Sequence, residues 1–224
     1  MEKKIEYKEL YNNQDRVLDA IFQSGTVFYL TGGTCLGRFY FEKRYSEDLD
    51  LFTSDNTIYR EEVRILLDKL DNQGIEVDIN VDTRDFVRIT ADSFLQIDMV
   101  NDRVYRHGRS VRTEKGYMID NLENITANKI GAIISRDEPK DVFDLYIVSR
   151  HRAFHWSEIL SIADKKNLLD KELMEYRLRS FPLDLVNTLA VTDPVFLKQF
   201  YKDYPVLVAE IINERENSLI GAAG

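Results

Sequence analysis

The sequence predicts an α+β fold, in which a mixed or antiparallel sheet with flanking helices is followed by a helical C-terminal region. Apolar and polar residues alternate in runs between residues 75 and 119, as in half-buried strands. After residue 121 the apolar residues recur at helical spacing to the end of the chain. We therefore expect an α+β core over residues 1–120 and a helical region over residues 121–224.

Short helices and strands are expected to alternate before the sheet region. A helix is predicted over residues 5–25, where apolar residues follow the helical period and a glycine ends the run. The apolar run 27–30 is rich in strand formers, and a helix over 36–43 is expected just after two glycines. A strand over 48–53 and an amphipathic helix over 57–74 follow.

Clean alternation over residues 75–81 and 94–100 predicts two strands of the sheet. His107-Gly108 lies between two such runs and is typical of a hairpin turn. We expect four or five strands in all.

Helices are expected in the C-terminal region over residues 122–136, 142–152 and 156–166, with more to the end of the chain. Pro182, Pro194 and Pro205 are expected to start or break helices there.

Composition excludes several classes of protein. The 224 residues include 30 Lys and Arg against 39 Asp and Glu, a net charge of −9, which argues against a general nucleic-acid or membrane-surface coat. The single cysteine, Cys35, excludes an internal disulfide, indicates a reducing compartment and is expected to be a buried small hydrophobe. Residues 1–10 are densely charged, unlike a signal peptide, and no apolar run is long enough to span a membrane. We expect a cytoplasmic protein with no membrane partner.

Two carboxylates flank a leucine at the start of a predicted strand. Residues i and i+2 of a strand face the same way, so Asp48 and Asp50 project together, away from the leucines beside them. Adjacent carboxylates repel unless a cation lies between them. A hard divalent ion, Mg²⁺ above all, relieves that repulsion and leaves sites for a substrate phosphate. An isolated Asp-x-Asp more often lies at the edge of a surface strand without binding a metal. The neighbouring sequence must therefore decide between the two interpretations.

The preceding strand ends in a glycine pair that opens a helix. Gly32, Gly33 and Thr34 offer backbone N–H groups and the positive end of a helix dipole to an anion. Taken alone, the Gly-Gly pair indicates only a tight turn. Together with the acidic pair that follows, it favours a phosphate cradle facing a metal site.

Asp98 is the third candidate carboxylate. Its apolar neighbours Ile97 and Met99 face the other side of the strand, so the charge indicates that its face borders a polar site. Three carboxylates on adjacent strands can hold two metal ions roughly 3.5–4 Å apart, an arrangement that supports in-line displacement at phosphorus. Asp78 and Asp82 are rival third ligands, ranked lower because they fit the exposed face of an alternating strand.

Four blocks of sequence resemble one known family. Residues 31–34 read Thr-Gly-Gly-Thr and residues 44–52 read Arg-Tyr-Ser-Glu-Asp-Leu-Asp-Leu-Phe. Residues 128–136 read Asn-Lys-Ile-Gly-Ala-Ile-Ile-Ser-Arg, and residues 140–146 read Lys-Asp-Val-Phe-Asp-Leu-Tyr. The pattern resembles the AbiEii/AbiGii toxin family of nucleotidyltransferases, within the DNA polymerase β-like superfamily. The resemblance implies a nucleotidyltransferase-like sheet, with an NTP as substrate and Mg²⁺ as cofactor, with room for two ions.

The resemblance implies roles for residues of the first two blocks and for Asp98. Asp48 and Asp50 match the family's metal-binding pair, and Asp98 fits its third acid, which binds the second ion or takes the acceptor's proton. Ser46 matches the serine before the acidic pair and can hydrogen-bond nucleotide phosphates. Arg44, two residues earlier, carries a positive charge as the family's pattern requires and is expected to bind the nucleotide as well.

The later blocks imply a second set of residues. Lys129 and Arg136 share one helix face and are expected to bind the nucleotide, Lys129 by neutralising triphosphate charge in the transition state. Asp141 and Asp144 match the family's closing acids, and Asp141 is expected to be catalytic. Lys140 stands where the family often has Arg, which keeps the charge and loses bidentate geometry. The structural alternative is a solvated helix face, or exposed ion pairs worth ~0–1 kcal/mol.

Two local basic clusters interrupt the acidic chain. The first comprises Arg103, Arg106, His107, Arg109, Arg112 and Lys115. Residues 150–152 with His155 form the second. The first cluster suits a polyanionic acceptor such as RNA, although a basic hairpin tip is slightly more often a solvated surface without function. The histidines predict no metal site, because His151 and His155 lack a third ligand.

Three hypotheses follow. The first is a metal-dependent nucleotidyltransferase that moves a nucleoside monophosphate from an NTP to an acceptor, with tRNA or other RNA as the candidate. By resemblance, it would be the toxin of a bacterial toxin–antitoxin or phage-defence pair, with a cognate antitoxin as partner. The second keeps the chemistry and changes the acceptor to a small molecule, as in antibiotic-modifying nucleotidyltransferases. The third is a non-catalytic NTP-binding or interaction module.

Overall fold

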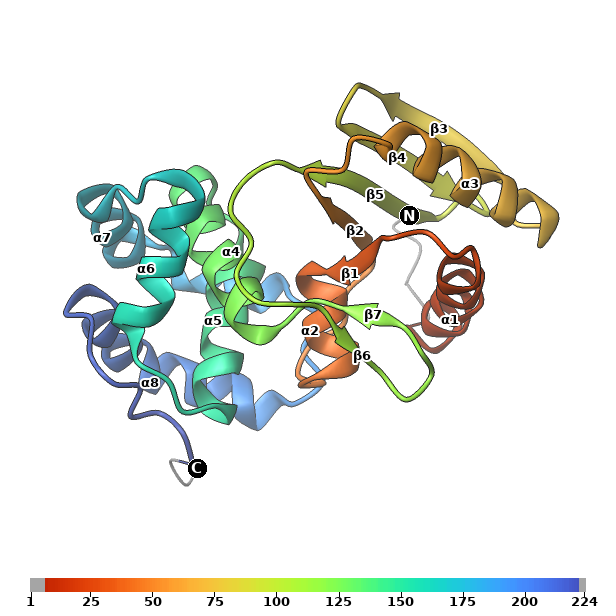
Figure 1. The fold of residues 1–224 in the computed structure, drawn as a ribbon. Helices are drawn as coiled ribbons and strands as arrows, with labels where there is room; N and C mark the ends of the chain where they lie inside the picture. The colour runs from red at the N-terminus through yellow and green to blue at the C-terminus, as the bar shows by residue number, and fades with distance from the viewer. Residues whose placement is uncertain (1–6, 222–224) are drawn as a thin grey trace. The chain divides into compact units, whose positions relative to one another are not determined.

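A computed structural model describes residues 7–221, and these divide into two compact units (Figure 1). The first unit consists of residues 7–35, 46–104 and 109–120. The second consists of residues 36–45, 105–108 and 121–221. Each unit is therefore built from segments that are separated in the sequence. The predicted helix start at Ile5 lies outside the described residues.

The first unit contains a seven-stranded mixed sheet, in the order β3-β4-β5-β2-β1-β7-β6. The β2–β5 and β1–β7 pairs are parallel and the other pairs are antiparallel. The strands are β1 (Tyr29–Thr31), β2 (Leu49–Ser54), β3 (Val77–Asp82), β4 (Phe86–Ala91), β5 (Leu95–Asp102), β6 (Val111–Arg112) and β7 (Met118–Ile119). The predicted mixed sheet is confirmed. The expected number of strands was too low, because β6 and β7 have two residues each and are too short to show alternation.

Two amphipathic helices of the first unit, α1 (Tyr7–Gln23) and α3 (Tyr59–Asn72), contact each other and the sheet. In Figure 1, α3 runs alongside β3 and β4. Their buried stripes include Leu18 and Ile21 on α1 and Leu66 on α3, all at most 1% exposed. Burial of such side chains contributes roughly 1.5–3 kcal/mol each.

The structure corrects three local predictions. Helix α2 spans Gly32–Phe39, not residues 36–43, because Gly32 with φ +71° turns the chain directly from β1 into the helix. His107-Gly108 is no hairpin turn, since it connects β5 to β6 and these strands are not neighbours. Pro205 breaks no helix and lies inside the last one.

The second unit is helical over its longest segment. Its helices are α4 (Leu122–Ser135), α5 (Pro139–His151), α6 (Trp156–Asn167), α7 (Lys171–Ser180), the 3₁₀ helix η1 (Leu183–Thr188) and α8 (Pro194–Ile212). Side chains cap the N-termini of α4, α7 and α8, where Asn121, Asp170 and Asp193 accept hydrogen bonds from first-turn N–H groups. Fully buried Trp156, Tyr146 and other aromatic residues fill the core. Among the described helices, none is long and apolar enough to cross a bilayer.

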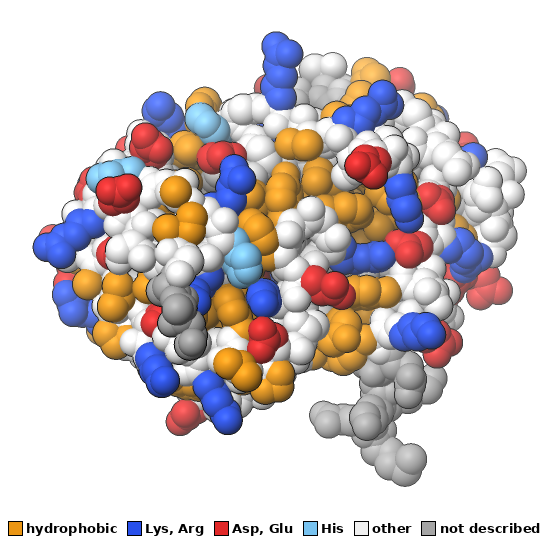
Figure 2. All heavy atoms as spheres, turned by 90° about the horizontal axis from the view of Figure 1, so that it is seen from below, with side chains coloured by type: hydrophobic (Ala, Val, Ile, Leu, Met, Phe, Trp, Pro, Cys, Tyr) orange, Lys and Arg blue, Asp and Glu red, His pale blue; other side chains and the backbone are white. Residues whose placement is uncertain are grey.

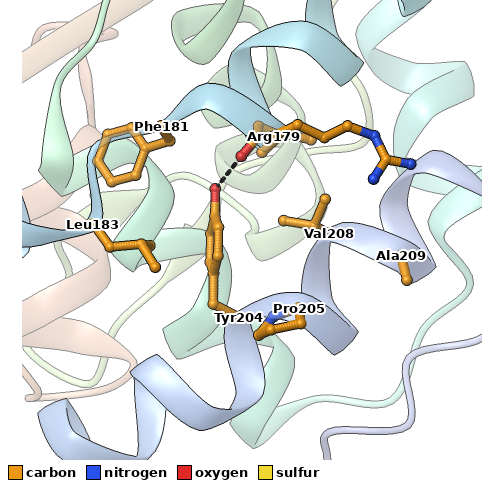
Figure 3. Close-up of a pocket in the computed structure, with 8 residues that line it drawn as sticks. Arg179, Phe181, Leu183, Tyr204, Pro205, Val208 and Ala209 are labelled. Carbon is orange, nitrogen blue, oxygen red and sulfur yellow. Dashed lines mark hydrogen bonds between the residues drawn. The ribbon is translucent and has the colours of Figure 1, made fainter.

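A pocket of about 330 Å³ lies between the α7–η1 segment and α8 (Figure 3). Leu183, Val208 and other apolar side chains line it, with Arg179 at its edge. The Tyr204 hydroxyl donates a 2.6 Å hydrogen bond to the carbonyl of Leu178. None of the predicted site residues lines this pocket.

Candidate active site

Four polar residues form a row across the middle of the sheet. Thr31 of β1 pairs with Asp50 of β2, Asp50 pairs with Asp98 of β5, and Asp98 pairs with Arg88 of β4. We call these four residues the polar row. Cross-strand partners share one face of a sheet, so the predicted proximity of Asp50 and Asp98 follows from the parallel β2–β5 register.

Asp48 is the residue immediately before the first residue of β2. The fully buried Leu49 and Leu51 anchor β2 in the core, while Asp48 and Asp50 remain partly exposed. Local hydrogen bonds hold the approach to the strand. The Ser46 hydroxyl donates to Asp48 Oδ1 at 3.2 Å, and the Thr34 hydroxyl donates to the Asp48 carbonyl. The predicted glycine turn and acidic pair are thus directly connected.

Gly32 makes the close approach of the glycine turn to Asp50 sterically feasible. A Cβ at this position would lie 2.1 Å from Asp50 Oδ2, where no real Cβ could remain. Its φ of +71° is also in the region that glycine adopts at little cost. The first turn of α2 includes Gly33 and Thr34, and its N-terminal N–H groups provide the predicted anion cradle beside the acidic pair.

Asp98 has a partner that the sequence analysis did not assign. The Arg88 guanidinium donates to both of its carboxylate oxygens, with Nε–Oδ1 and Nη2–Oδ2 distances of 2.7 Å. Within residues 7–221, no group of three His, Cys, Asp or Glu side chains is arranged to hold a metal ion. The rivals Asp78 and Asp82 lie on the edge strand β3, where Asp82 pairs with Arg60 at 2.5 Å.

Buried ion pairs join three segments of the second unit. The Arg44 guanidinium binds both oxygens of Asp144 at 2.7 Å. Lys129 Nζ lies 2.8 Å from Asp144 Oδ2 and 2.7 Å from Asp141 Oδ1. Arg136 extends this series of ion pairs, with its Nε 2.8 Å from Asp141 Oδ2. We call these five residues the ion-pair network.

Most of the ion-pair network is withdrawn from water. Asp141 and Asp144 are at most 1% exposed, and Lys129 and Arg44 are also buried, whereas the Arg136 side chain is 49% exposed. The alternative of a solvated helix face or exposed ion pairs is therefore wrong for Lys129. Three cations and two carboxylates make up the network, and Arg136 forms its solvent-exposed end.

Mutual attraction keeps the members of the network charged. Burial raises the pKa of Asp144, but the charges of Arg44 and Lys129 outweigh it and hold that pKa below its usual value. The pKa of Asp141 is lowered in the same way, against burial, by Lys129 and Arg136. Burial lowers the pKa of Lys129, and the two aspartates more than compensate, so that pKa is raised.

Two residues at the polar row were missed by the sequence analysis. Arg88 had a usable signal, since alternation in β4 puts it on one face with Phe86 and Thr90. Asp120 is fully buried directly after β7 and accepts a 2.8 Å hydrogen bond from the Thr31 hydroxyl. No local pattern distinguishes Asp120 from a surface loop residue.

The two basic clusters are not uniform cationic surfaces. Arg103 pairs with Asp55 at 2.8 Å and with Asp85 at 2.7 Å, and Arg150 pairs with Asp203 at 3.0 Å. On the face drawn in Figure 2, basic side chains are interspersed with acidic ones. A contact surface for RNA therefore stays a prediction.

Cys35 is fully buried on α2, as expected for a small hydrophobe. Burial, followed by the nearby Asp120 carboxylate, raises the pKa of the thiol well above its usual value. Because the thiolate is the reactive form, the native protein should not react with a disulfide reagent at pH 8. Colorimetric titration should detect one thiol per chain only after unfolding in guanidinium. Rapid stoichiometric labelling of the native protein would contradict this burial.

Comparison with known proteins decides the family. The family described as "Nucleotidyl transferase AbiEii toxin, Type IV TA system" matches residues 16–218. The chain belongs to this family. AbiEii proteins are nucleotidyltransferases, so the sequence resemblance to that family is confirmed, and the chain is a transferase by membership. No curated protein matches the chain.

Solved structures share the fold of this chain over almost its whole length. JHP933 from Helicobacter pylori has 22% identity and a TM-score of 0.56, covering 90% of this chain and 91% of its own. A putative nucleotidyltransferase from H. pylori has 22% identity and a TM-score of 0.57, covering 90% and 94%. The nucleotidyltransferase toxin MenT4 from Mycobacterium tuberculosis has 12% identity and a TM-score of 0.51, covering 92% and 93%. At these identities the likeness concerns the fold.

Proposed function

We propose that this AbiEii protein transfers a nucleoside monophosphate from an NTP to an RNA acceptor, in a reaction that requires Mg²⁺. Its setting would be the bacterial cytoplasm, as the toxin of a toxin–antitoxin or phage-defence pair with a cognate antitoxin as partner. Family membership supports nucleotidyl transfer and the toxin class. The metal, the acceptor, the antitoxin and the residue roles belong to the proposal.

The observation that supports the proposal most is the contact between the glycine turn and the acidic pair. Asp48 and Asp50 supply the hard oxygen donors that Mg²⁺ prefers, and both are partly exposed. The missing side chain of Gly32 brings the anion-binding helix terminus against Asp50. The donor set therefore fits a divalent ion that also touches a phosphate.

Each candidate site residue of the first unit has a role under this proposal. Asp48 and Asp50 would hold Mg²⁺, and Asp98 would complete the set or accept the acceptor's proton. The bound ion would supply Lewis-acid stabilisation of charge that develops on the phosphoryl oxygens. Gly33 and Thr34 would bind a phosphate through backbone N–H groups. Ser46 holds Asp48 in place or donates to a phosphate.

The ion-pair network is proposed as a second element of nucleotide binding. The network contains three cations, and the half-exposed guanidinium of Arg136 can offer a bidentate contact to a phosphate. Lys129 is already bound to two aspartates, so we propose that Lys129 and Arg44 attract the phosphate through their positive charge. Asp141, the expected catalytic acid, links Lys129 to Arg136 and would fix both cations.

Transfer of label from an NTP to RNA tests the proposal. The purified protein is incubated with Mg²⁺, total RNA and each α-labelled NTP in turn, beside the variant Asp48→Asn/Asp50→Asn. Loss of the metal site should lower the rate ~10³-fold or more, because bound metal contributes several kcal/mol of transition-state stabilisation. EDTA should abolish labelling.

A matched control removes two other carboxylates of the same unit. Asp78→Asn/Asp82→Asn lies on the exposed edge strand β3 and should retain wild-type activity. Equal activity of the two double variants would overturn the assignment of the acidic pair. Labelling of a small molecule in place of RNA would move the acceptor to the antibiotic-type alternative. Metal-dependent NTP binding without transfer to any acceptor would favour the non-catalytic module.

A further inference from the structure

The strongest unassigned feature beside the acidic pair is the charge on β4. Arg88 faces Asp98 across the β4–β5 ladder, and Asp98 faces Asp50 across the β5–β2 ladder. Two carboxylates in direct cross-strand register repel each other, and Asp98 is largely buried, with a side-chain exposure of 12%. The bidentate Arg88 guanidinium provides the charge that offsets this repulsion.

The charge of Arg88 is stabilised by all three carboxylates of the acidic site. Its hydrogen bond to Asp98 is the largest cause that raises the pKa of the guanidinium, burial acts against it, and the charges of Asp98, Asp48 and Asp50 add to the rise. These are the same three carboxylates that are candidates for the metal. A bidentate guanidinium and a divalent ion use the same carboxylate lone pairs, so they compete for Asp98.

Release of Arg88 is structurally easy. Its side chain is 38% exposed, so the guanidinium can leave Asp98 for solvent without crossing packed core. The ring of Phe86, two residues earlier on the same face of β4, lies 5.4 Å from the guanidinium carbon while Arg88 is bound to Asp98. The guanidinium therefore has an aromatic neighbour on its own strand besides its carboxylate partner.

We propose that Arg88 is a resident counter-ion of the acidic site that holds Asp98 in the metal-free protein and yields it when a divalent cation binds. The proposal rests on the proposed function, because it takes Asp48, Asp50 and Asp98 as metal ligands. Arg88 is a positioning residue that acts through Asp98. It keeps the acidic group compact without metal, and it weakens metal affinity by competition.

Mn²⁺ binding measured by electron paramagnetic resonance tests this inference without reference to catalysis. Arg88→Ala should bind Mn²⁺ roughly three- to tenfold more tightly than wild type, since a partly exposed charge-assisted contact no longer competes. The metal-free variant should melt below wild type, and its rise in Tm on adding Mn²⁺ should be larger. Arg88→Lys, which keeps the charge and loses the bidentate fork, should lie between the two.

Two further variants separate competition from general loss of charge. Arg60→Ala removes an Arg–Asp pair from the same unit and should leave Mn²⁺ affinity unchanged. Adding Asp98→Asn to Arg88→Ala should cancel the gain in affinity, because the released ligand is then absent. Unchanged or weaker Mn²⁺ binding by Arg88→Ala, with wild type binding metal and transferring nucleotide, would overturn this inference alone. Absence of Mn²⁺ binding to wild type would overturn it together with the metal dependence of the proposed function.

Discussion

Asp144→Asn should destabilise the protein by about 3–5 kcal/mol, because it leaves buried cations without their counter-charge. Arg44 binds both oxygens of Asp144 and Lys129 binds one, and all three side chains are at most 8% exposed. The amide that replaces the carboxylate carries no charge and presents N–H donors to groups that are themselves only donors. Urea denaturation followed by circular dichroism measures the loss.

An exposed pair in the same unit provides the control. Arg177 binds both oxygens of Asp137 at 2.7 and 2.8 Å, but the Asp137 side chain is 56% exposed. Asp137→Asn should therefore cost only ~0–1 kcal/mol. A similar loss in both variants would show that burial of the network contributes nothing.

The effect of Asp144→Asn also has a pH signature. The folded-state pKa of Asp144 is lowered, so its contribution is present above the unfolded value of about 4 and is lost as the pH falls through the folded value. The difference between wild type and variant should be complete at pH 7 and should shrink in acid below about pH 4. A difference of equal size at pH 3 and pH 7 would contradict the ion-pair explanation.

Gly32→Ala should lower nucleotidyl transfer by about a hundredfold or more while the protein stays folded. The new Cβ would meet Asp50 Oδ2 at 2.1 Å, so the carboxylate must move, and displacement of a reacting group by about 1 Å costs that much in rate. Strain at φ +71° adds only about 1–2 kcal/mol to the loss of stability. Initial rates and Mn²⁺ affinity, compared with thermal melting, separate the two effects.

Gly74→Ala carries the same backbone strain without the clash. Gly74 has φ +68°, and no atom lies within 4 Å of the place that a Cβ would take, so the substitution should reduce stability slightly and leave the transfer rate unchanged. Wild-type activity of both alanine variants would mean that the position of Asp50 is not critical. A parallel loss of activity in both would point to stability alone.

Local patterns predicted the strand faces well, because side-chain direction along a strand depends only on period two. They placed Asp98 on a polar face and put it on a strand adjacent to that of Asp50, as the register confirms. They could not reveal that Arg88 is the partner of Asp98, because the register of β4 on β5 is set by pairing along the whole hairpin. The short strands β6 and β7 were missed for lack of any period to detect.

The ion-pair network was also predictable in part from local sequence and in part not. Helical spacing predicted that Lys129 and Arg136 share one face, and that Asp141 and Asp144 share another. Nothing local indicates that these faces meet in the core, or that Arg44 joins them from 100 residues away. Motif resemblance selected all five residues, but their burial required the tertiary fold.

The membership of residues 36–45 in the second unit has a consequence for synthesis on the ribosome. Leu36 is part of that unit's core, and Tyr40 and Phe41 pack against it, yet the partner of Arg44 is translated 100 residues later. At roughly 5–20 residues per second the segment waits about 5–20 s for Asp144. The nascent chain of this toxin-family protein therefore cannot complete its helical unit while the sheet is still being made, because the partners of this segment have not yet been synthesised.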